Sequence, residues 1–307
     1  MEFGSVNNLE GIDFNLPPDH PFTTKLLHQN NNVVQPQLYV GCPIWACKEW
    51  VGTWYPPTAK EKDFLFHYTR QFNTIELNTT HYRIPDKATV KQWKEKATPH
   101  FLFCPKLLQE ISHQQQLKGK IAYELTQFFL ENIAELDNNL GIIFIQLPPY
   151  FDADKLDILA NYVEKLPRNM EFAVEFRHES WFIANDNGEK PIDEAAEILQ
   201  KYQIATIQSD VAGRRDVLHQ CLTTNLLALR FVGNDLHPTD YSRTDEWTQK
   251  IAQWAKGGLA KSYLFIHEPA NTKAPEMAVY WIEKLNALGY TLQQPKKFAS
   301  IQPKSLF

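Results

Sequence analysis

The sequence predicts an α/β fold in which a single (β/α)8 barrel of the TIM type follows a polar, poorly ordered N-terminal extension. Eight short apolar runs indicate buried strands, and segments with helical periodicity separate them in regular alternation. An open, doubly wound sheet would alternate in the same way, but no GxGxxG follows the first strand and no GxxxxGK[ST] occurs in the chain. The length of 307 residues suits one large domain without a dividing linker, so we expect the extension at 1–36 and the barrel at 37–307.

The extension is rich in Asn, Gln and Pro and has weak periodicity, which predicts a segment that is poorly ordered or lies along the surface. The strands begin after it. Each is a short run of apolar residues, many of them β-branched or aromatic, as expected for strands buried on both faces of a parallel sheet. The expected strands are 38–42, 72–78, 100–106, 141–147, 171–177, 204–210, 226–232 and 262–268.

Amphipathic stripes and capping signals predict the helices between the strands. Thr58 and Glu61 have the spacing of a capping box, and Asp86 precedes the first turn of another helix. Asp152 is a candidate cap for a third. The expected helices are 58–68, 85–97, 121–136, 156–163, 191–202, 245–256 and 275–288, with only a weak helical pattern at 217–222.

Composition and charge exclude several classes of protein. With 43% apolar residues, 22% charged residues and a net charge of −5, the chain is neither disordered nor a collagen, nor the basic protein expected to coat nucleic acid. Four cysteines without CxxC spacing indicate ordinary thiols. Because no apolar run approaches the roughly 20 residues of a membrane span and the N-terminus lacks the order of a secretory signal, we expect a cytoplasmic protein without membrane association.

Polar residues gather at the carboxyl ends of the expected strands. Residues two apart in a strand share a face, so Glu76 and Asn78 point the same way, as do Glu175 and Arg177. Barrels of this type place their chemistry at that end, the mouth. The alternative is a self-neutralising ion-pair network that closes the barrel, but the restriction to one end favours a site. The residues are Glu76, Asn78, Lys106, Gln146, Glu175, Arg177, Asp210, Arg230, His267 and Glu268.

Aromatic residues make up 13% of the chain, and many fall in loops that follow the strands. Trp45 and Trp50 follow the first strand, Tyr82 and Arg83 the second, and Trp181 the fifth. Aromatic side chains next to a polar surface bind ligands that have a flat face, such as sugars or nucleobases. The alternative is a hydrophobic lid packed on itself.

Two kinds of chemistry fit these residues. Glu76 and Glu175 could act as a general acid and base, with His113 and His178 as further proton carriers. The cations Lys106, Arg177 and Arg230 could hold a phosphate or carboxylate. These cations also disfavour a divalent metal between the nearby acidic residues, so the sequence predicts no metal and no cofactor. No GxSxG and no Cys–His pairing is present, so covalent catalysis is not predicted.

At these residues the sequence resembles the YecE-like family, known as domain of unknown function 72, over about residues 38–288. The matching blocks are GCPIWACKEWVGTWYP, FNTIELNTTHYRIP, FLFCPKLLQEISH, IIFIQLPPYF and FAVEFRHESW. The resemblance implies a TIM-type barrel with the polar residues of these blocks around its mouth. It implies no reaction, because the activity of the family is not established. The chain departs from the family pattern at His81, at His267-Glu268 and at Ala270-Asn271.

The sequence therefore predicts that the mouth binds a small polar or anionic molecule containing a sugar or phosphate group. The sequence does not decide whether the protein is an enzyme. If it is one, a hydrolase or lyase is the interpretation that the carboxylates favour. The alternative is a non-catalytic module that binds a nucleotide or nucleic acid with the same mouth, and a third is a scaffold with a closed polar mouth. The expected binding residues are Lys106, Arg177, Arg230, Asn78, Tyr82, Arg83, Gln146, Asp210, Trp45, Trp50, Trp181 and His267.

Overall fold

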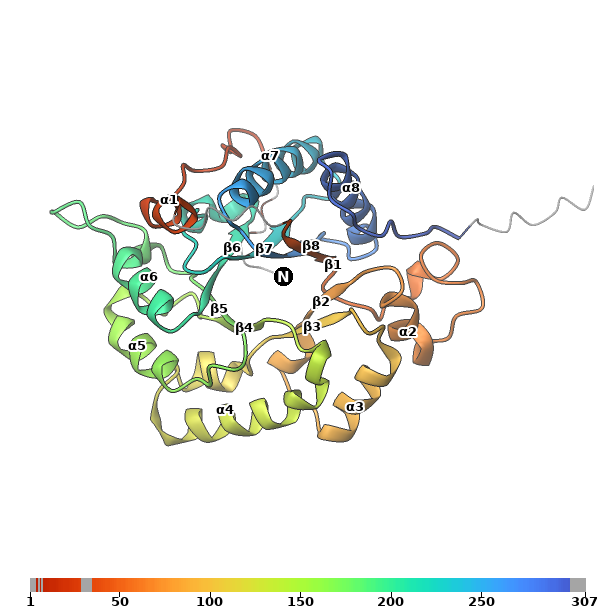
Figure 1. Cartoon of the computed structure of the whole chain (residues 1–307), viewed down its shortest axis with the longest axis horizontal. Coiled ribbons are helices and arrows are strands. Elements are labelled where there is room, and N and C mark those ends of the chain that lie inside the picture. The colour runs from red at the N-terminus through yellow and green to blue at the C-terminus, as the bar shows by residue number, and fades with distance from the viewer. Residues whose placement is uncertain (1–3, 5, 7, 29–34, 299–307) are drawn as a thin grey trace, which may run out of the picture.

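Parallel strands lie around a common centre and helices cover their outer side (Figure 1). The computed structural model describes residues 4, 6, 8–28 and 35–298. The remaining parts of the expected extension and the last residues of the expected barrel lie outside the described residues. Eight strands occur in the described part: β1 (Gln37–Gly41), β2 (Thr74–Leu77), β3 (Leu102–Pro105), β4 (Ile143–Gln146), β5 (Phe172–Glu175), β6 (Ala205–Asp210), β7 (Leu226–Val232) and β8 (Lys261–His267).

The backbone ladders divide the strands into two sheets. Six strands pair in the order β1-β8-β7-β6-β5-β4, and β2 pairs with β3, all in parallel. Isolated bridges, among them one between Lys106 and Phe144, continue the order from β3 to β4. No ladder joins β1 to β2 in the described residues, so the sheet is not closed. The predicted α/β fold with parallel strands is confirmed, whereas the predicted closed barrel is not shown.

Side chains take the place of a ladder between β1 and β2. The Tyr68 hydroxyl accepts a hydrogen bond from the Cys42 amide over 2.7 Å and donates to the Thr74 carbonyl over 3.0 Å. Asn73 bonds the backbone of β1 with both ends of its side-chain amide. Gly41 passes so close to β2 that a Cβ there would lie 1.9 Å from the Thr74 carbonyl oxygen. The two strands are therefore neighbours that are joined by side chains.

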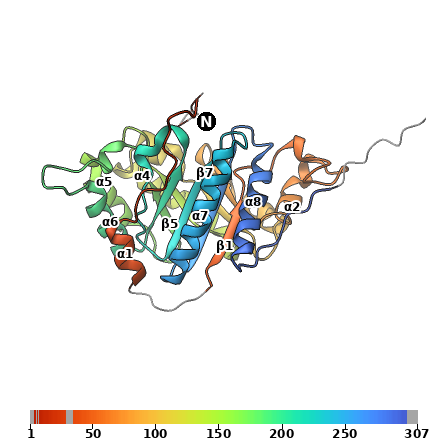
Figure 2. The same ribbon diagram turned by 90° about the horizontal axis from the view of Figure 1, so that it is seen from above.

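Helices follow most strands, as the alternation predicted. These helices are α2 (Phe64–Tyr68), α3 (Lys87–Lys96), α4 (Gly119–Ile133), α5 (Leu156–Glu164), α6 (Pro191–Lys201), α7 (Pro238–Lys256) and α8 (Ala274–Ala287). A further helix, α1 (Pro21–His28), precedes β1 in the expected extension. Figure 2 shows α7 and α8 alongside β7 and β1. Within the described ranges, no helix is both long enough and apolar enough to cross a bilayer.

The capping residues at three helix starts can be compared with the prediction. Asp86 caps α3 as predicted, because its carboxylate accepts from the Thr89 amide over 2.7 Å. The predicted capping box at Thr58 does not form, and a short 3-10 turn over Glu61–Asp63 leads into α2 instead. α7 starts earlier than predicted because Asp240 bonds the backbone ahead of Pro238. The weak helical pattern at 217–222 does not form a helix, and a 3-10 turn over Ala212–Val217 precedes it.

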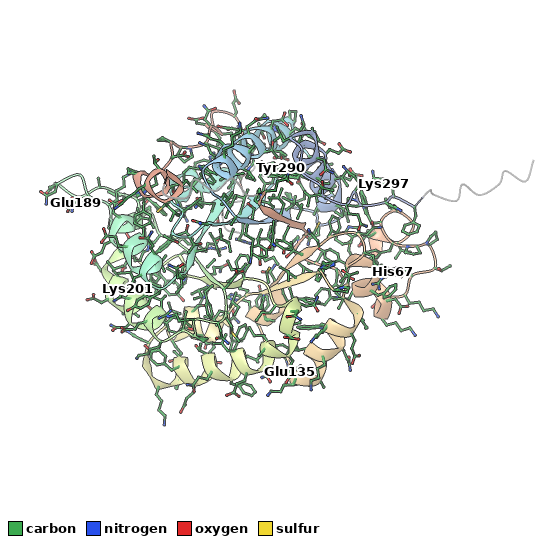
Figure 3. The ribbon with its side chains drawn as sticks, in the orientation of Figure 1. His67, Glu135, Glu189, Lys201, Tyr290 and Lys297 are labelled. Carbon is green, nitrogen blue, oxygen red and sulfur yellow. The ribbon has the colours of Figure 1, made fainter. Side chains whose placement is uncertain are left out.

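The centre of the molecule is filled by side chains (Figure 3), with charged residues such as Glu135 and Lys201 at the periphery. An apolar cluster that includes Phe144, Ile207 and Phe265 is almost fully buried there. Each of these residues lies two positions before a polar residue at the carboxyl end of its own strand, so both share a face. A polar layer therefore rests directly on an apolar one.

The described part of the N-terminal segment lies against the loop that follows β6 and against α6 and α7. The Arg215 guanidinium donates to three consecutive backbone carbonyls, those of residues 13–15. Thr23 exchanges hydrogen bonds with the backbone of Gln220 and Leu222. Figure 2 shows α1 next to α6, where His20 lies 2.8 Å from Asp193.

Candidate functional site

Eight polar side chains meet at the carboxyl ends of the strands, and we call them the mouth cluster. Because the strands are parallel, these ends lie on the same side of the molecule. Each of these residues is 0–6% exposed, so the cluster is almost completely removed from solvent. It consists of Glu76, Lys106, Gln146, Glu175, Arg177, Ser209, Arg230 and His267. The prediction that polar residues from separate strands converge here agrees with this geometry.

Arg230 on β7 joins the two carboxylates of the cluster. Its Nε lies 3.0 Å from Glu76 Oε2, and its Nη1 lies 3.0 Å from Glu175 Oε1. Burial would lower the pKa of Arg230, but the two carboxylates outweigh burial and raise it. The guanidinium is therefore a permanent positive charge at the centre of the site.

Glu76 on β2 accepts hydrogen bonds from Arg230 and His267 and forms an ion pair with Lys106. His267 Nε2 lies 2.6 Å from Oε2, and Lys106 Nζ lies 3.3 Å from Oε1. Burial opposes ionisation of Glu76, yet Arg230, His267 and Lys106 hold its pKa well below the usual value. Burial also lowers the pKa of His267, more than Glu76 raises it, so this imidazole is neutral at neutral pH and donates through Nε2.

Glu175 on β5 carries its hydrogen bonds on one oxygen. Oε1 accepts from Arg230, from Arg177 Nη2 over 3.2 Å and from the Ser209 hydroxyl over 2.6 Å. Oε2 is buried and has no hydrogen-bond partner among the described residues. Burial would raise the pKa of Glu175, but Arg177 and Arg230 lower it to about 2. The carboxylate is thus ionised, with one oxygen available as an acceptor.

The ionisation of both carboxylates bears on their predicted roles. A general acid must hold a proton at the working pH, and the lowered pKa values of Glu76 and Glu175 leave none there. Because both carboxylates are ionised, neither is suited to act as a general acid, whereas either could act as a general base.

Lys106 follows β3 and is held by two neighbours. Its Nζ donates to Gln146 Oε1 over 3.0 Å and pairs with Glu76. Burial lowers the pKa of Lys106 to about 8; Glu76 opposes this shift and the nearby Arg230 adds to it. Burial and the same neighbouring guanidinium also lower the pKa of Arg177, against the effect of Glu175. With His267 neutral, three cations face two anions, an excess of one positive charge.

A pair of histidines lies next to the cluster. Gln146 directs Oε1 at Lys106, so its amide nitrogen faces His113 Nε2 over 3.5 Å. His113 sits on a π-helical turn, Glu110–Gln114, and its ring centroid is 5.1 Å from that of His81. Burial lowers the pKa of both imidazoles to about 4, so both are neutral. π-Helical turns are frequent at functional sites.

The outer residues of the predicted site differ in exposure. Tyr82 is 71% exposed and packs edge-on against His81, and Arg83 next to it is also exposed. Asn78 and Trp45 are half-buried, and Trp45 packs against Trp93 with ring centroids 5.8 Å apart. These residues are more exposed than the mouth cluster.

Three predicted site residues have structural roles instead. Trp50 and Trp181 were expected to wall a pocket, but they are 1% and 0% exposed within the apolar core, where burial of a large ring is most favourable. His178 was expected to move protons, but its Nδ1 accepts from the Ser180 amide over 3.1 Å and caps a 3-10 turn.

Asp210 is the clearest departure from the predicted site. Its carboxylate lies in a second cluster against α7, with Arg243 Nη1 at 2.9 Å, Trp247 Nε1 at 2.6 Å and Arg215. Neighbouring residues of a strand point to opposite faces, so Ser209 enters the mouth cluster and Asp210 points outward.

Ser209 escaped the sequence analysis, whereas His81 was noted only as a departure from the family pattern. Ser209 could have been found from strand alternation, since it lies two residues after the inward-facing Ile207. His81 lies in a loop, where no periodicity assigns a direction. Among the described residues, no three His, Cys, Asp or Glu side chains group as a metal ion would require.

Comparisons with known proteins place the chain in a family. Residues 39–300 match the family model described as "Protein of unknown function DUF72". The UPF0759 protein YecE of Escherichia coli K12 is 30% identical over 255 residues, which cover 78% of this chain and 89% of YecE. The UPF0759 protein YunF of Bacillus subtilis 168 is 25% identical over 152 residues, which cover 47% of this chain and 52% of YunF.

Two solved structures share the fold. A DUF72 family protein of Enterococcus faecalis V583 superposes with a TM-score of 0.63 and 16% identity, over 88% of this chain and 100% of the other. One of Thermotoga maritima MSB8 superposes with a TM-score of 0.59 and 22% identity, over 83% and 100%. The family match and the YecE relative confirm the resemblance seen in the sequence: the chain belongs to the DUF72 family.

Proposed function

We propose that the chain is a TIM-type barrel enzyme that binds a small anionic molecule, with a carboxylate or phosphate group, at the mouth cluster. In this proposal the side-chain bridges between β1 and β2 complete the barrel. The observation that supports it is the convergence of five charged side chains from the carboxyl ends of four strands, β2, β3, β5 and β7, with three cations against two anions. We place the function in the cytoplasm, in keeping with four free thiols.

The charge excess explains why an anion would bind. An uncompensated charge removed from water is costly, and burial together with Arg230 already lowers the pKa of Lys106. An anion next to Lys106 and Arg177 would neutralise the excess and raise that pKa again.

Proton transfer in this proposal uses the free side of Glu175. Oε2 has no hydrogen-bond partner, so it can accept a proton from a bound molecule. Because the pKa of Glu175 is about 2, it is a weak base and suits a substrate whose proton is already acidified.

The test is the effect of small anions on thermal stability. Phosphate, sulfate and citrate are added to the wild type and to Arg177→Gln. At about a hundred times Kd, binding to the native state alone stabilises by about 2.7 kcal/mol, roughly a 5 °C rise in Tm. We expect this rise in the wild type and its loss in R177Q.

Arg243→Gln is the matched control. Arg243 is also 1% exposed and ion-paired, but it belongs to the Asp210 cluster. R243Q should lower Tm without ligand and keep the rise with anion. A wild type that no anion stabilises would contradict the proposal. A shift that weakens steeply with salt, and is largest for single-stranded oligonucleotides, would favour the nucleic-acid alternative.

A further inference from the structure

Lys106 differs from the other lysines of the described chain because it alone is buried, at 5% exposure. Its backbone is held on both sides: its amide donates to the Leu77 carbonyl over 3.3 Å, and its carbonyl accepts from the Thr80 hydroxyl over 2.7 Å. An isolated bridge also pairs it with Phe144. The residue is therefore fixed at the carboxyl end of β3, where rigid placement favours precise chemistry.

The surroundings of the Lys106 amine are polar but contain no base that would be protonated in its place. Gln146 Oε1 accepts a hydrogen bond from Nζ over 3.0 Å, and Glu76 Oε1 lies 3.3 Å from Nζ in an ion pair. His113 behind Gln146 is neutral, since burial lowers its pKa to about 4. With a pKa of about 8, Lys106 changes charge closer to neutral pH than an ordinary lysine does.

We propose that the Lys106 amine is a nucleophile that forms an imine with the carbonyl group of a small anion, such as a 2-oxo acid or a phosphorylated aldehyde. This step rests on the proposed anion binding, which brings the carbonyl compound to the amine. A buried amine beside other cations is the setting in which lysine acts as a nucleophile.

The step balances without a further reactant. The ammonium form first releases one proton to solvent. The neutral nitrogen adds to the carbonyl carbon, and one amine proton passes to the oxygen to form a carbinolamine. The carbon–oxygen bond then breaks, the second amine proton leaves with the oxygen as water, and the carbon–nitrogen double bond remains. Protonation of that imine acidifies the adjacent C–H bond, which suits the weak base Glu175 and its free Oε2.

The experiment traps the imine in the full-length protein. The wild type is incubated at pH 7 with glyoxylate, pyruvate or glyceraldehyde 3-phosphate, each with sodium borohydride, and modified lysines are mapped by mass spectrometry after digestion. With a pKa of about 8, the neutral fraction of Lys106 exceeds that of an ordinary lysine roughly 200-fold. We expect labelling of Lys106 at least about tenfold above any other lysine.

Two variants separate this proposal from the anion-binding function. Lys106→Arg keeps the charge but cannot form the imine, so it should lose the adduct, and the rise of Tm with phosphate is judged on the wild type. Lys250→Arg, at a lysine paired with Asp19 on the outer side, should keep both. The location of the modified lysines is determined in the wild type. The proposal can therefore be tested even if the K106R protein fails to fold.

Labelling spread over exposed lysines, or no labelling with any of the three probes, would overturn the imine. If phosphate still raises Tm in that case, the anion-binding function stands. If no anion raises Tm and no adduct forms, both proposals fall.

Discussion

Arg230 organises the site at the scale of single residues because its guanidinium reaches both carboxylates at once. Its Nε and Nη1 point in fixed directions and lie 3.0 Å from Glu76 and 3.0 Å from Glu175. A lysine ammonium is a compact charge and would not span the two in this way. Since ions are costly to bury, removing one partner leaves the others uncompensated.

Glu76→Gln tests this dependence. The change removes the negative charge among Arg230, His267 and Lys106, and we expect a loss of about 3–5 kcal/mol in the free energy of unfolding, measured with urea. Glu171→Gln is the control, since Glu171 is 47% exposed in its pair with Lys261 and should cost at most about 1 kcal/mol. Equal losses in both variants would show that the buried network does not stabilise the fold.

The pKa of Glu175 predicts a dependence on pH. It is about 2 in the folded protein against an ordinary value of 4.5, so the unfolded chain binds more protons between these values. The stability that Glu175 contributes is therefore complete above about pH 4.5 and decreases as the pH falls toward 2. Urea unfolding of wild type and Glu175→Gln from pH 6 downward should show their difference shrinking below about 4.5. A constant difference would mean that the buried carboxyl is not ionised.

At the scale of secondary-structure elements, strand alternation decides which residues enter the site. On β5, β7 and β8 the polar residues Glu175, Arg230 and His267 lie two positions after Ala173, Ala228 and Phe265, which belong to the apolar layer. The predicted strands end within two residues of the observed ones, and polar residues lie at those ends. Direction was missed at β6, because the sequence analysis assigned Asp210 by its charge and not by its position in the alternation.

The contact between β1 and β2 yields a prediction of its own. Tyr68→Phe removes the hydroxyl that joins the strands and leaves the buried Cys42 amide and Thr74 carbonyl without that partner, at a cost of about 1–3 kcal/mol. Hydrogen exchange at the Cys42 amide should accelerate more than at amides of β7.

Tyr162→Phe is the control for Tyr68. Tyr162 is equally buried, but its hydroxyl bonds Thr126, which keeps a second bond to the Ala122 carbonyl. We expect a smaller loss there and no change at Cys42. The same exchange pattern in both variants would show that Tyr68 does not hold the two strands together.

At the scale of the whole molecule, much of the fold follows from periodicity. The eight predicted strands overlap the observed ones, and the helices after β3 to β5 begin and end near their predicted positions, because buried strands and amphipathic helices leave strong patterns. The way in which β1 and β2 contact each other could not be predicted from periodicity, since their link depends on the Tyr68 and Asn73 side chains. The position of an aromatic residue in a loop also does not predict whether its side chain is buried: Trp50 and Trp181 follow strands, and both are buried in the core.

The central claim is that the mouth cluster binds a small anion, and a crystal structure grown with phosphate, examined at the carboxyl ends of the strands, tests it most directly. The account predicts an anion within hydrogen-bond distance of Arg177 and Lys106. A cluster whose ion pairs close on one another, with no anion at saturating phosphate, would contradict the claim and identify the mouth as a structural network.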